Sequence, residues 1–365
     1  MTRFRNVAVA VAVVLLAPLT VAMPSRGATL GVTFRNRMLL GDSATDQNSN
    51  VFTVTGLSGL THSGGSQFWA AMDSSDKLVE LDVTLGASGL ISAASVTAGL
   101  TLSQTWDLEG IAYTDPVRNS VFVSEETTPG VHEYSLADGS NLQSLDVPDL
   151  FTNIVGNRGF ESLGRKADGA LMITANEEAL TVDGPVSTSS TGTIVRLLHY
   201  DVVGNAASAA QQYAYETAPI HNVIGTPHVS GLVDLVVLPN GKVLTLERSG
   251  AFGLPPFENR IYELDFTGAT DVSGLAGLIG QTFTLVQKDL LWSSTSDIGE
   301  NLEGLALGPQ LLNGNHALLG IVDDGDSISS NTLAAFELTG DIPEPGTGML
   351  LVFAAVWVCG RRRPI

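Results

Sequence analysis

Acidic residues recur at one place in a phrase that the sequence repeats. In this phrase an apolar residue stands beside an acidic or small one, as at residues 107–112. A second apolar run follows the phrase and ends in acidic residues, as at 121–126. Such a repeat indicates five structural units that carry their acids in the same place. The aligned positions, 51, 52, 73 and 69 residues apart, are Ser58, Glu109, Glu161, Asp234 and Glu303. The acids that end the second runs are Asp73, Glu126, Glu177, Glu247 and Asp323.

The elements that position these acids are predicted to be short β-strands. β-branched and aromatic runs punctuated by Gly, Asn and Asp fill the chain, and helical periodicity is nearly absent. Each interval holds about four strands, which predicts an all-β fold, a β-propeller of five or six four-stranded blades over residues 30–340. Residues 30–55 add one or two strands that either complete the last blade or belong to a sixth. A β-sandwich is the alternative, but it gives no reason for acids at one fixed position.

In a propeller the innermost strand of each blade lines a central channel, so the aligned acids are expected to converge there. Clustered carboxylates repel one another unless a cation neutralises them, and Ca²⁺ prefers such oxygen ligands. The predicted calcium ligands are Glu109, Glu161, Asp234, Glu303 and Asp323. In the alternative, each acid accepts hydrogen bonds from backbone amides of a neighbouring blade and fastens the ring.

Candidate catalytic groups lie near the same channel. Glu177 and Glu247 end second runs and are candidates for general acid–base work. Arg248 follows Glu247, and Arg158 stands just before the third phrase. Either guanidinium suits a phosphate, which it holds through two parallel hydrogen bonds, or an ion pair with its acidic neighbour. The sequence has no nucleophile elbow, P-loop or dinucleotide fingerprint, which argues against lipase-type, NTPase and dehydrogenase chemistry.

The N-terminus has the features of a secretory signal peptide, predicted to span residues 1–22. Arg3 and Arg5 precede an apolar run at 7–16, and small residues suit cleavage after Ala22. Cleavage after Ala28 and retention as a membrane anchor are the alternatives. The apolar run is short for a bilayer span of about 20 residues, which favours a cleaved signal.

The C-terminus, residues 343–365, combines Pro-Glu-Pro at 343–345, an apolar run at 349–359 and three arginines at 361–363. A generic tail anchor is the alternative, but the run is short for a permanent span. The order of the three parts resembles the PEP-CTERM sorting signal. The resemblance implies transient contact with the inner membrane, cleavage near Pro345 by an exosortase-type protease, and release to the surface or matrix of a Gram-negative bacterium. Both terminal apolar segments are expected to form helices.

The charge balance restricts the partners of the body that remains. The chain has 18 Lys and Arg against 38 Asp and Glu, a net charge of −20, and removal of both ends would take away five arginines and no acid. Such a body repels nucleic acid and anionic lipid. The only cysteine, Cys359, lies in the tail, so the mature protein would have no disulfide and no thiolate metal site.

Four phrases in order resemble the phytase-like family, which is named for the esterase-like activity of phytase. They are DLEGIA at 107–112, NRGFESL at 157–163, LTLER at 244–248 and NLEGLA at 301–306. The resemblance runs from about residue 56 to residue 338 and implies a propeller with phosphoester hydrolase activity. The polar residues that match are Glu109, Glu161, Glu177, Glu247, Arg248, Glu303 and Asp323.

Together these features favour an exported, divalent-cation-dependent phosphoester hydrolase with Ca²⁺ as cofactor and a small phosphoester as substrate. The strong acidity of the body argues against phytate as that substrate, because phytate sites need many Lys and Arg. The alternative function is non-catalytic: a propeller of the extracellular matrix that binds polysaccharide or another protein.

Overall fold

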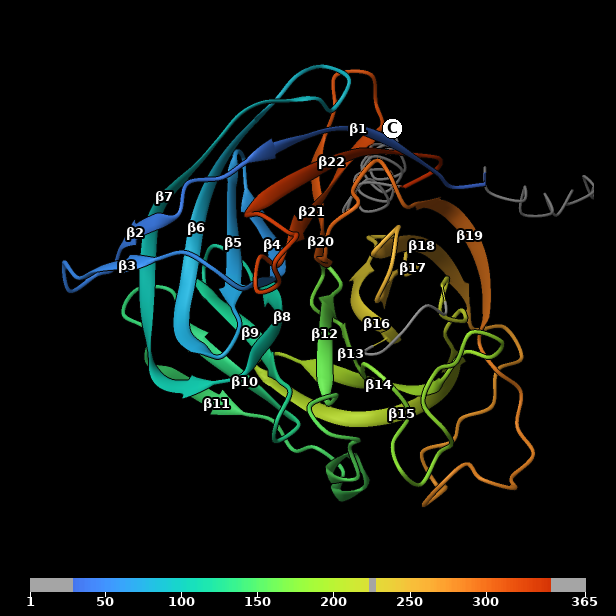
Figure 1. Cartoon of the computed structure of the whole chain (residues 1–365). Coiled ribbons are helices and arrows are strands. Elements are labelled where there is room, and N and C mark those ends of the chain that lie inside the picture. Colours follow the sequence, from blue (N-terminus) through green and yellow to red (C-terminus); the bar gives the residue numbers. More distant parts are fainter. Residues whose placement is uncertain (1–28, 223–227, 343–365) are drawn as a thin grey trace, which may run out of the picture.

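Five four-stranded antiparallel sheets surround a common axis in the computed structural model, which describes residues 29–222 and 228–342 (Figure 1). The prediction of an all-β propeller is confirmed, and the number of blades is five. No helix within the described ranges is both long and apolar enough to cross a membrane. The expected terminal helices, the signal peptide and the sorting tail lie outside the described residues.

The first two blades follow one another along the chain, and in each the strands run outward from the axis in sequence order. Blade 1 contains β4 (Leu57–Gly64), β5 (Gln67–Met72), β6 (Ser75–Leu85) and β7 (Ile91–Trp106). Blade 2 contains β8 (Leu108–Tyr113), β9 (Ser120–Glu125), β10 (Gly130–Ser135) and β11 (Asn141–Ser144). A short 3₁₀ turn, η1 (Asp149–Thr152), leads to the next blade.

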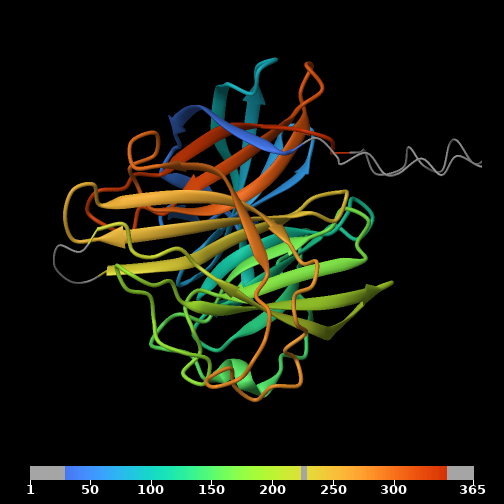
Figure 2. The ribbon, with the colours of Figure 1, turned by 90° about the vertical axis from the view of Figure 1, so that its right-hand side faces the viewer.

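Blades 3 and 4 repeat the same strand order, and Figure 2 shows their sheets stacked beside each other. Blade 3 contains β12 (Phe160–Arg165), β13 (Leu171–Asn176), β14 (Ile194–Val203) and β15 (Ala206–Glu216). Blade 4 contains β16 (His228–Val237), β17 (Val243–Ala251), β18 (Phe257–Asp265) and β19 (Gln287–Ser294).

Blade 5 closes the ring by combining the two ends of the described chain. Its inner strands β20 (Leu302–Gln310), β21 (His316–Val322) and β22 (Thr332–Thr339) come from the C-terminal part, and its outer strand β1 (Gly31–Leu39) comes from the N-terminal part. β1 pairs antiparallel with β22 along its length. Of the two sequence predictions for residues 30–55, completion of the last blade is therefore correct. The small hairpin of β2 (Ser43–Thr45) and β3 (Val51–Thr53) then lies against β7.

The hydrophobic core is divided among the five blade interfaces. Each of the five larger apolar clusters joins side chains of two neighbouring blades, for example Leu60 of blade 1 with Leu319 of blade 5. The inner strands β4, β8, β12, β16 and β20 contact one another in turn around the axis. Since every sheet buries both faces against its neighbours, the ring positions the five inner strands and whatever side chains they carry.

Candidate functional site

Each inner strand carries a β-bulge at the repeated phrase. The pairing with the second strand of the blade shifts between Leu108 and Ile111 in blade 2, and at the matching place in every other blade. A bulge places extra residues opposite its partner strand and re-aims their side chains. The residues that directly follow the first bulge residue are Ser58, Glu109, Glu161, Val233 and Glu303.

The alignment of Asp234 with Glu161 and Glu303 is corrected by this register. Leu232 is the counterpart of Phe160 and Leu302, so Val233 takes the acid position in blade 4 and Asp234 follows it. Asp234 is buried among backbone amides. One carboxylate oxygen accepts a hydrogen bond from the N–H of Leu305 at 2.6 Å, and the other accepts from the N–H of Leu235 at 2.8 Å and of Leu163 at 3.5 Å. Asp234 thus fastens blades 3, 4 and 5 together, as the alternative for the repeated acids proposed.

The second strands add a matching set of side chains next to the first. The backbone N–H of Asp73, Glu126, Glu177 and Asp323 each donates to the residue before the bulge, at 2.6–3.0 Å. In blade 4 this position belongs to Arg248, which pairs with Gly231. We call the acids of the two positions the acidic ring. Its members are Asp73, Glu109, Glu126, Glu161, Glu177, Glu303 and Asp323.

Glu247 lies on the opposite face of β17 from Arg248, because neighbouring residues of a strand point to opposite faces. Its carboxylate is fully buried and accepts from Lys288 Nζ at 2.5 Å, from the hydroxyl of Tyr215 and from the backbone N–H of Ala218 at 2.7 Å. The structure therefore keeps Glu247 apart from the acidic ring, in the packing between blades 3 and 4.

Carboxylates of the ring come close enough to share a cation. Oxygens of Glu126, Glu161 and Glu177 lie within 4.8 Å of one another, and all three side chains are buried. Asp73, Asp107 and Glu109 form a second group of the same size.

On the blade 5 side, Asn301 Nδ2 donates to Glu303 at 2.9 Å and to Asp323 at 3.1 Å. Of the predicted calcium ligands, Glu109, Glu161, Glu303 and Asp323 thus lie in the ring, together with the predicted catalytic Glu177.

Burial and the charges of neighbouring acids raise the pKa values of four ring glutamates. Burial and then the charge of Glu177 raise the pKa of Glu126 to about 9. Burial raises the pKa of Glu303 to about 8, although Arg248 opposes the rise. The pKa values of Glu109 and Glu161 lie well above their usual range, because both are buried beside other acids. The ring therefore has more acidic groups than the neighbouring positive charges neutralise.

Two arginines stand at the edge of the ring. Arg248 Nη2 donates to Glu303 at 2.7 Å and to Glu177 at 3.4 Å, while its buried Nε has no hydrogen-bond partner. Burial lowers the pKa of Arg248, but the charges of Glu303 and Glu177 raise it further, so the guanidinium stays charged. Arg158 contacts Glu178 and lies 4.0 Å from Glu177. The two predicted phosphate-binding groups thus meet at Glu177 from different blades.

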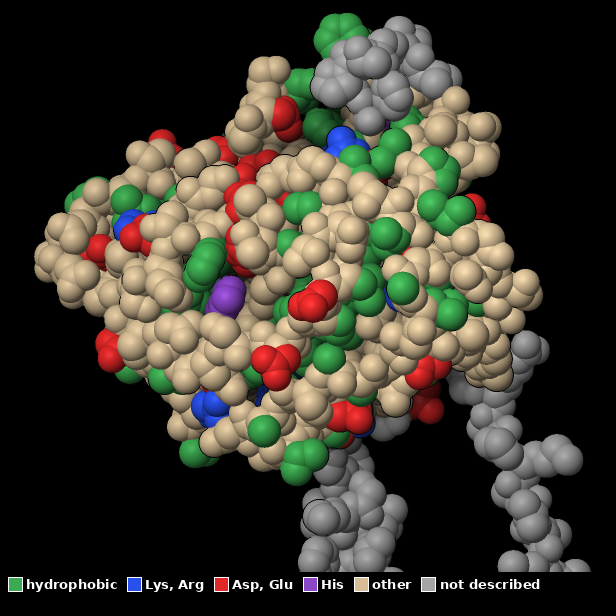
Figure 3. Space-filling view, turned by 90° about the horizontal axis from the view of Figure 1, so that it is seen from below, with side chains coloured by type: hydrophobic (Ala, Val, Ile, Leu, Met, Phe, Trp, Pro, Cys, Tyr) green, Lys and Arg blue, Asp and Glu red, His purple; other side chains and the backbone are tan. Residues whose placement is uncertain are grey.

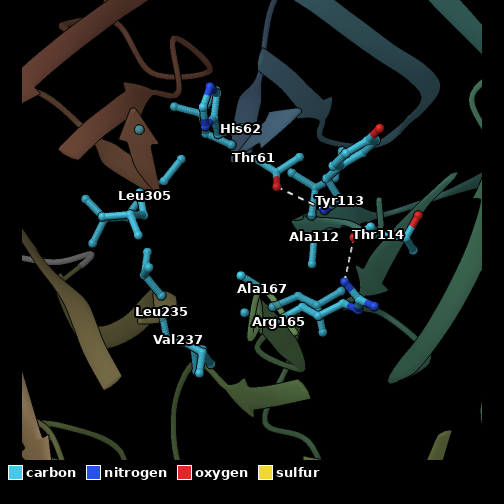
Figure 4. Close-up of a pocket in the computed structure, with 18 of the residues that line it drawn as sticks. Thr61, His62, Ala112, Tyr113, Thr114, Arg165, Ala167, Leu235, Val237 and Leu305 are labelled. Carbon is cyan, nitrogen blue, oxygen red and sulfur yellow. Dashed lines mark hydrogen bonds between the residues drawn. The ribbon is translucent and has the colours of Figure 1, made fainter. Parts of the chain in front are cut away.

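An apolar collar lies directly behind the acids. It is formed by the residue that ends each bulge or follows it, and each member is at most 2 % exposed: Leu60, Ile111, Leu163, Leu235 and Leu305. Beyond the collar the channel opens into a cavity of about 420 Å³. Figure 4 shows Leu235, Val237 and Leu305 facing Ala112 and Ala167 across it. This mouth has a mixed lining, in which apolar side chains alternate with polar ones such as His62, Asp115 and Arg165, and no member of the acidic ring lies there.

The sequence of residues 53–326 matches the family model described as "Phytase-like: Esterase-like activity of phytase". The chain belongs to the phytase-like family. None of the curated protein sequences matches it.

Solved structures that align over most of this phytase-like chain have low sequence identity and low TM-scores to it. Endo-arabinase from Bacteroides thetaiotaomicron is 10% identical, with 83% of this chain and 96% of that chain covered and a TM-score of 0.42. Glutaminyl cyclase from Myxococcus xanthus is 11% identical, with 87% and 100% covered and a TM-score of 0.38. Periplasmic gluconolactonase from Pseudomonas aeruginosa is 12% identical, with 86% and 100% covered and a TM-score of 0.36. These values carry no argument about activity, so the site is interpreted from its own residues.

Sequence reasoning assigned no role to Asp107, although it begins the DLEG phrase of this phytase-like chain. Its carboxylate accepts from Ser74 Oγ at 2.7 Å and from Thr127 Oγ1 at 2.7 Å. Burial works to raise the pKa of Asp107, but these hydrogen bonds and one from Asp73 bring it well below the usual range. These hydrogen bonds therefore favour the ionised form of Asp107. Asn301 occupies the equivalent position in the NLEG phrase. A polar residue at the start of both phrases is the signal in the sequence that this position faces the ring.

Proposed function

We propose that this phytase-like protein is a divalent-cation-dependent phosphoester hydrolase that acts outside the cell, with Ca²⁺ as its cation. The observation that carries the proposal is the acidic ring: buried and half-buried carboxylates from four blades surround one channel mouth, and Arg248 takes the equivalent place in the fifth. Asp234 and Glu247 are left out of the proposed site because backbone amides and Lys288 already satisfy them.

The donor set suits a hard divalent cation. Its oxygens come from carboxylates, and two groups of three carboxylates each have oxygens within 4.8 Å. Raised pKa values of buried acids mean that the fold holds more negative groups than its arginines neutralise. Ca²⁺ binds six to eight such oxygens without strict geometry, which fits a ring assembled from several blades.

The chain's own residues would then divide the work of hydrolysis. A bound divalent cation polarises a phosphoryl oxygen and lowers the pKa of water. Arg248, whose Nε has no partner, and Arg158 are placed to hold the phosphoryl group and stabilise its developing charge. Glu177, which contacts both arginines, orients them and is the nearest candidate for general acid–base work. The collar lines the channel behind the ring with apolar side chains.

The test is hydrolysis of 4-nitrophenyl phosphate by the purified protein with added Ca²⁺ and with a chelator. We expect turnover that the chelator abolishes. The double variant Glu109→Gln/Glu303→Gln should lose this turnover and keep its fold. The matched control Glu216→Gln/Asp289→Asn removes two exposed charges of the outer surface and should retain it. If calcium-loaded protein turns over neither phosphomonoesters, phosphodiesters nor carboxylic esters, the proposal is wrong, and the non-catalytic matrix function takes its place.

Export is the second part of the proposal. The signal-like residues 1–22 and the sorting tail at 343–365 support it, with an exosortase-type protease as processing partner and extracellular polysaccharide as the surroundings. Replacement of Pro343, Glu344 and Pro345 by alanine should leave a longer product in the membrane fraction of an expressing Gram-negative host. Equal release of this variant and the unchanged chain would contradict tail processing.

A further inference from the structure

A second cavity lies beside the acidic ring, and its two ends differ in chemistry. The cavity has a volume of about 350 Å³ and is bounded by the loop between β17 and β18, the start of β16 and the loop between β21 and β22. Arg158 and Arg248 line one end. The opposite wall is apolar and includes Phe252, Phe257 and Ile328. Arg248 lines this cavity and also contacts Glu177 and Glu303, so the cavity is adjacent to the ring.

The polar end can match one phosphoryl group. Arg248 is fastened by Nη2 alone, and its buried Nε–H lacks an acceptor. Arg158 already contacts Glu178 through Nη1. Asp326 also lines the cavity, but its oxygens accept from Ile328 N, Ser329 N and Ser329 Oγ within its own loop. Among the described lining residues, two guanidiniums are thus the whole positive charge, and carboxylates of the ring offset part of it.

The apolar end exposes more hydrophobic surface than a structural role requires. The side chain of Phe252 is 66 % exposed and that of Ile328 is 54 % exposed, although both line the same cavity. Leu254, 86 % exposed, lies in the same loop as Phe252. Large apolar side chains gathered at the rim of a pocket mark a ligand surface. An apolar ligand group would cover them and gain free energy by leaving water.

The acidity of the chain as a whole argues against a highly charged ligand. Figure 3 shows Asp and Glu side chains spread over one face of the molecule and few Lys or Arg. The chain as a whole has a net charge of −20. A ligand with several phosphates would be repelled over most of its approach and would find two guanidiniums at its destination.

We propose that the cavity beside the acidic ring binds an alkyl or aryl phosphate monoester, with its single phosphoryl group on Arg158 and Arg248 and its apolar group against Phe252 and Ile328. The catalytic part of this proposal rests on the proposed function. Hydrolysis breaks the bond between phosphorus and the ester oxygen; water supplies a hydroxyl to phosphorus and a proton to the departing alcohol. Polyphosphorylated polyols are poor ligands of the same cavity.

The experiment measures binding and turnover separately on the full chain with Ca²⁺. Calorimetry compares phenylphosphonate, which is not hydrolysed, with methylphosphonate and with inositol hexakisphosphate. We expect phenylphosphonate to bind at least about tenfold more tightly than methylphosphonate, because its ring adds apolar contact. Phe252→Ala/Ile328→Ala should remove this preference. Leu312→Ala/Val117→Ala, which truncates two exposed apolar side chains outside the cavity, should preserve it.

Each outcome decides one proposal. Equal binding of the two phosphonates, tighter binding of the hexakisphosphate, or a preference that survives Phe252→Ala/Ile328→Ala overturns the assignment of the cavity. If the phenyl preference depends on Phe252 and Ile328 but no phosphate ester is turned over, the binding site stands and the hydrolase function falls. If 4-nitrophenyl phosphate and glycerol phosphate are hydrolysed equally well, hydrolysis stands and the apolar subsite falls.

Discussion

Glu161 and Asp234 are both buried acids of the inner strands, yet their surroundings give them opposite effects on stability. Glu161 faces Glu126 and Glu177, whereas Asp234 faces backbone N–H groups. A buried charge beside like charges destabilises the fold unless a cation joins it, while a buried acceptor with several donors stabilises it. Two substitutions separate these cases.

Glu161→Gln is expected to stabilise the protein in chelator and to weaken its response to calcium. The substitution keeps the shape of the side chain and removes one of three adjacent carboxyls. We expect a gain on the order of 1 kcal/mol in chelator, about 2–4 °C in Tm, and a calcium affinity lower by about tenfold or more. Thermal melts with and without Ca²⁺ measure both. A lower Tm in chelator would show that Glu161 is a structural acceptor instead.

Asp234→Ala is expected to destabilise the protein with and without calcium. The substitution leaves the N–H of Leu305, now hydrogen-bonded at 2.6 Å, without an acceptor in the core. An unsatisfied buried donor costs about 1–3 kcal/mol, and Leu163 and Leu235 lose the same carboxylate. Urea unfolding measures the loss. If the loss of stability depended on calcium, Asp234 would be a cation ligand and not a structural acceptor.

The raised pKa values predict how stability depends on pH in chelator. A carboxyl with a raised pKa binds a proton in the folded state at a pH where the unfolded chain has released it. Its contribution is therefore fully present below about pH 4.5 and is lost as pH rises through about 8 for Glu303 and about 9 for Glu126. We expect Tm to fall from pH 6 to pH 9 in chelator, and Ca²⁺ to reduce this fall. A Tm that rises over the same range in chelator would contradict the assignment.

At the scale of the strands, the bulge explains which part of the site the sequence predicts. Four acids of the calcium prediction lie in the ring because their phrases share one spacing, and the turn residues between strands predict four strands per blade. In blade 4 the phrase Gly-Leu-Val-Asp places its acid one residue later. The sequence alone does not show where the strand pairing shifts, so it predicts Asp234 to be equivalent to Glu161. For the same reason it predicts Glu247 to lie near the channel, although its strand neighbour Arg248 holds that place.

A glycine follows the repeated position in blades 1, 2 and 5, after Ser58, Glu109 and Glu303, because there is no room for a side chain there. A Cβ at Gly110 would lie 2.2 Å from the backbone N of Leu163, and one at Gly304 would lie 2.8 Å from the backbone O of Ser58. The inner strands of neighbouring blades therefore approach each other most closely beside the acidic ring. Any side chain at these positions would push two blades apart.

Gly110→Ala is expected to destabilise the propeller and to disturb the ring. Backbone atoms of blade 3 cannot move away as a flexible side chain can, so the added methyl group should cost at least about 1–3 kcal/mol. Urea unfolding and calcium titration measure the two effects. Gly41→Ala is the matched control, because a Cβ there meets nothing within 4 Å, and it should change neither. A stable Gly110→Ala protein with unchanged calcium affinity would contradict the close approach.

At the scale of the whole molecule, the two mouths of the channel have different chemistry. The acidic ring with Arg158 and Arg248 lies at one mouth, a mixed apolar and polar lining that includes Arg165 lies at the other, and the collar of five buried side chains lies between them. This division requires all five blades, because the ring, the collar and the cavity each draw on non-adjacent parts of the chain. Closure of the ring by β1 is therefore a condition for the site.

Deletion of residues 29–40 tests that condition. The deletion removes the strand that pairs with β22, uncovers the edge of blade 5, and takes Leu30 and Val32 from the core. Loss of each such side chain costs about 1.5–3 kcal/mol, and an open strand edge favours aggregation. We expect a broad, low-temperature melt and loss of calcium binding, both restored by adding a peptide of residues 29–40. A scrambled peptide should restore neither. Because β22 reaches the ring only through β21 and β20, calcium binding that survived the deletion would show that the acidic ring forms without a closed propeller.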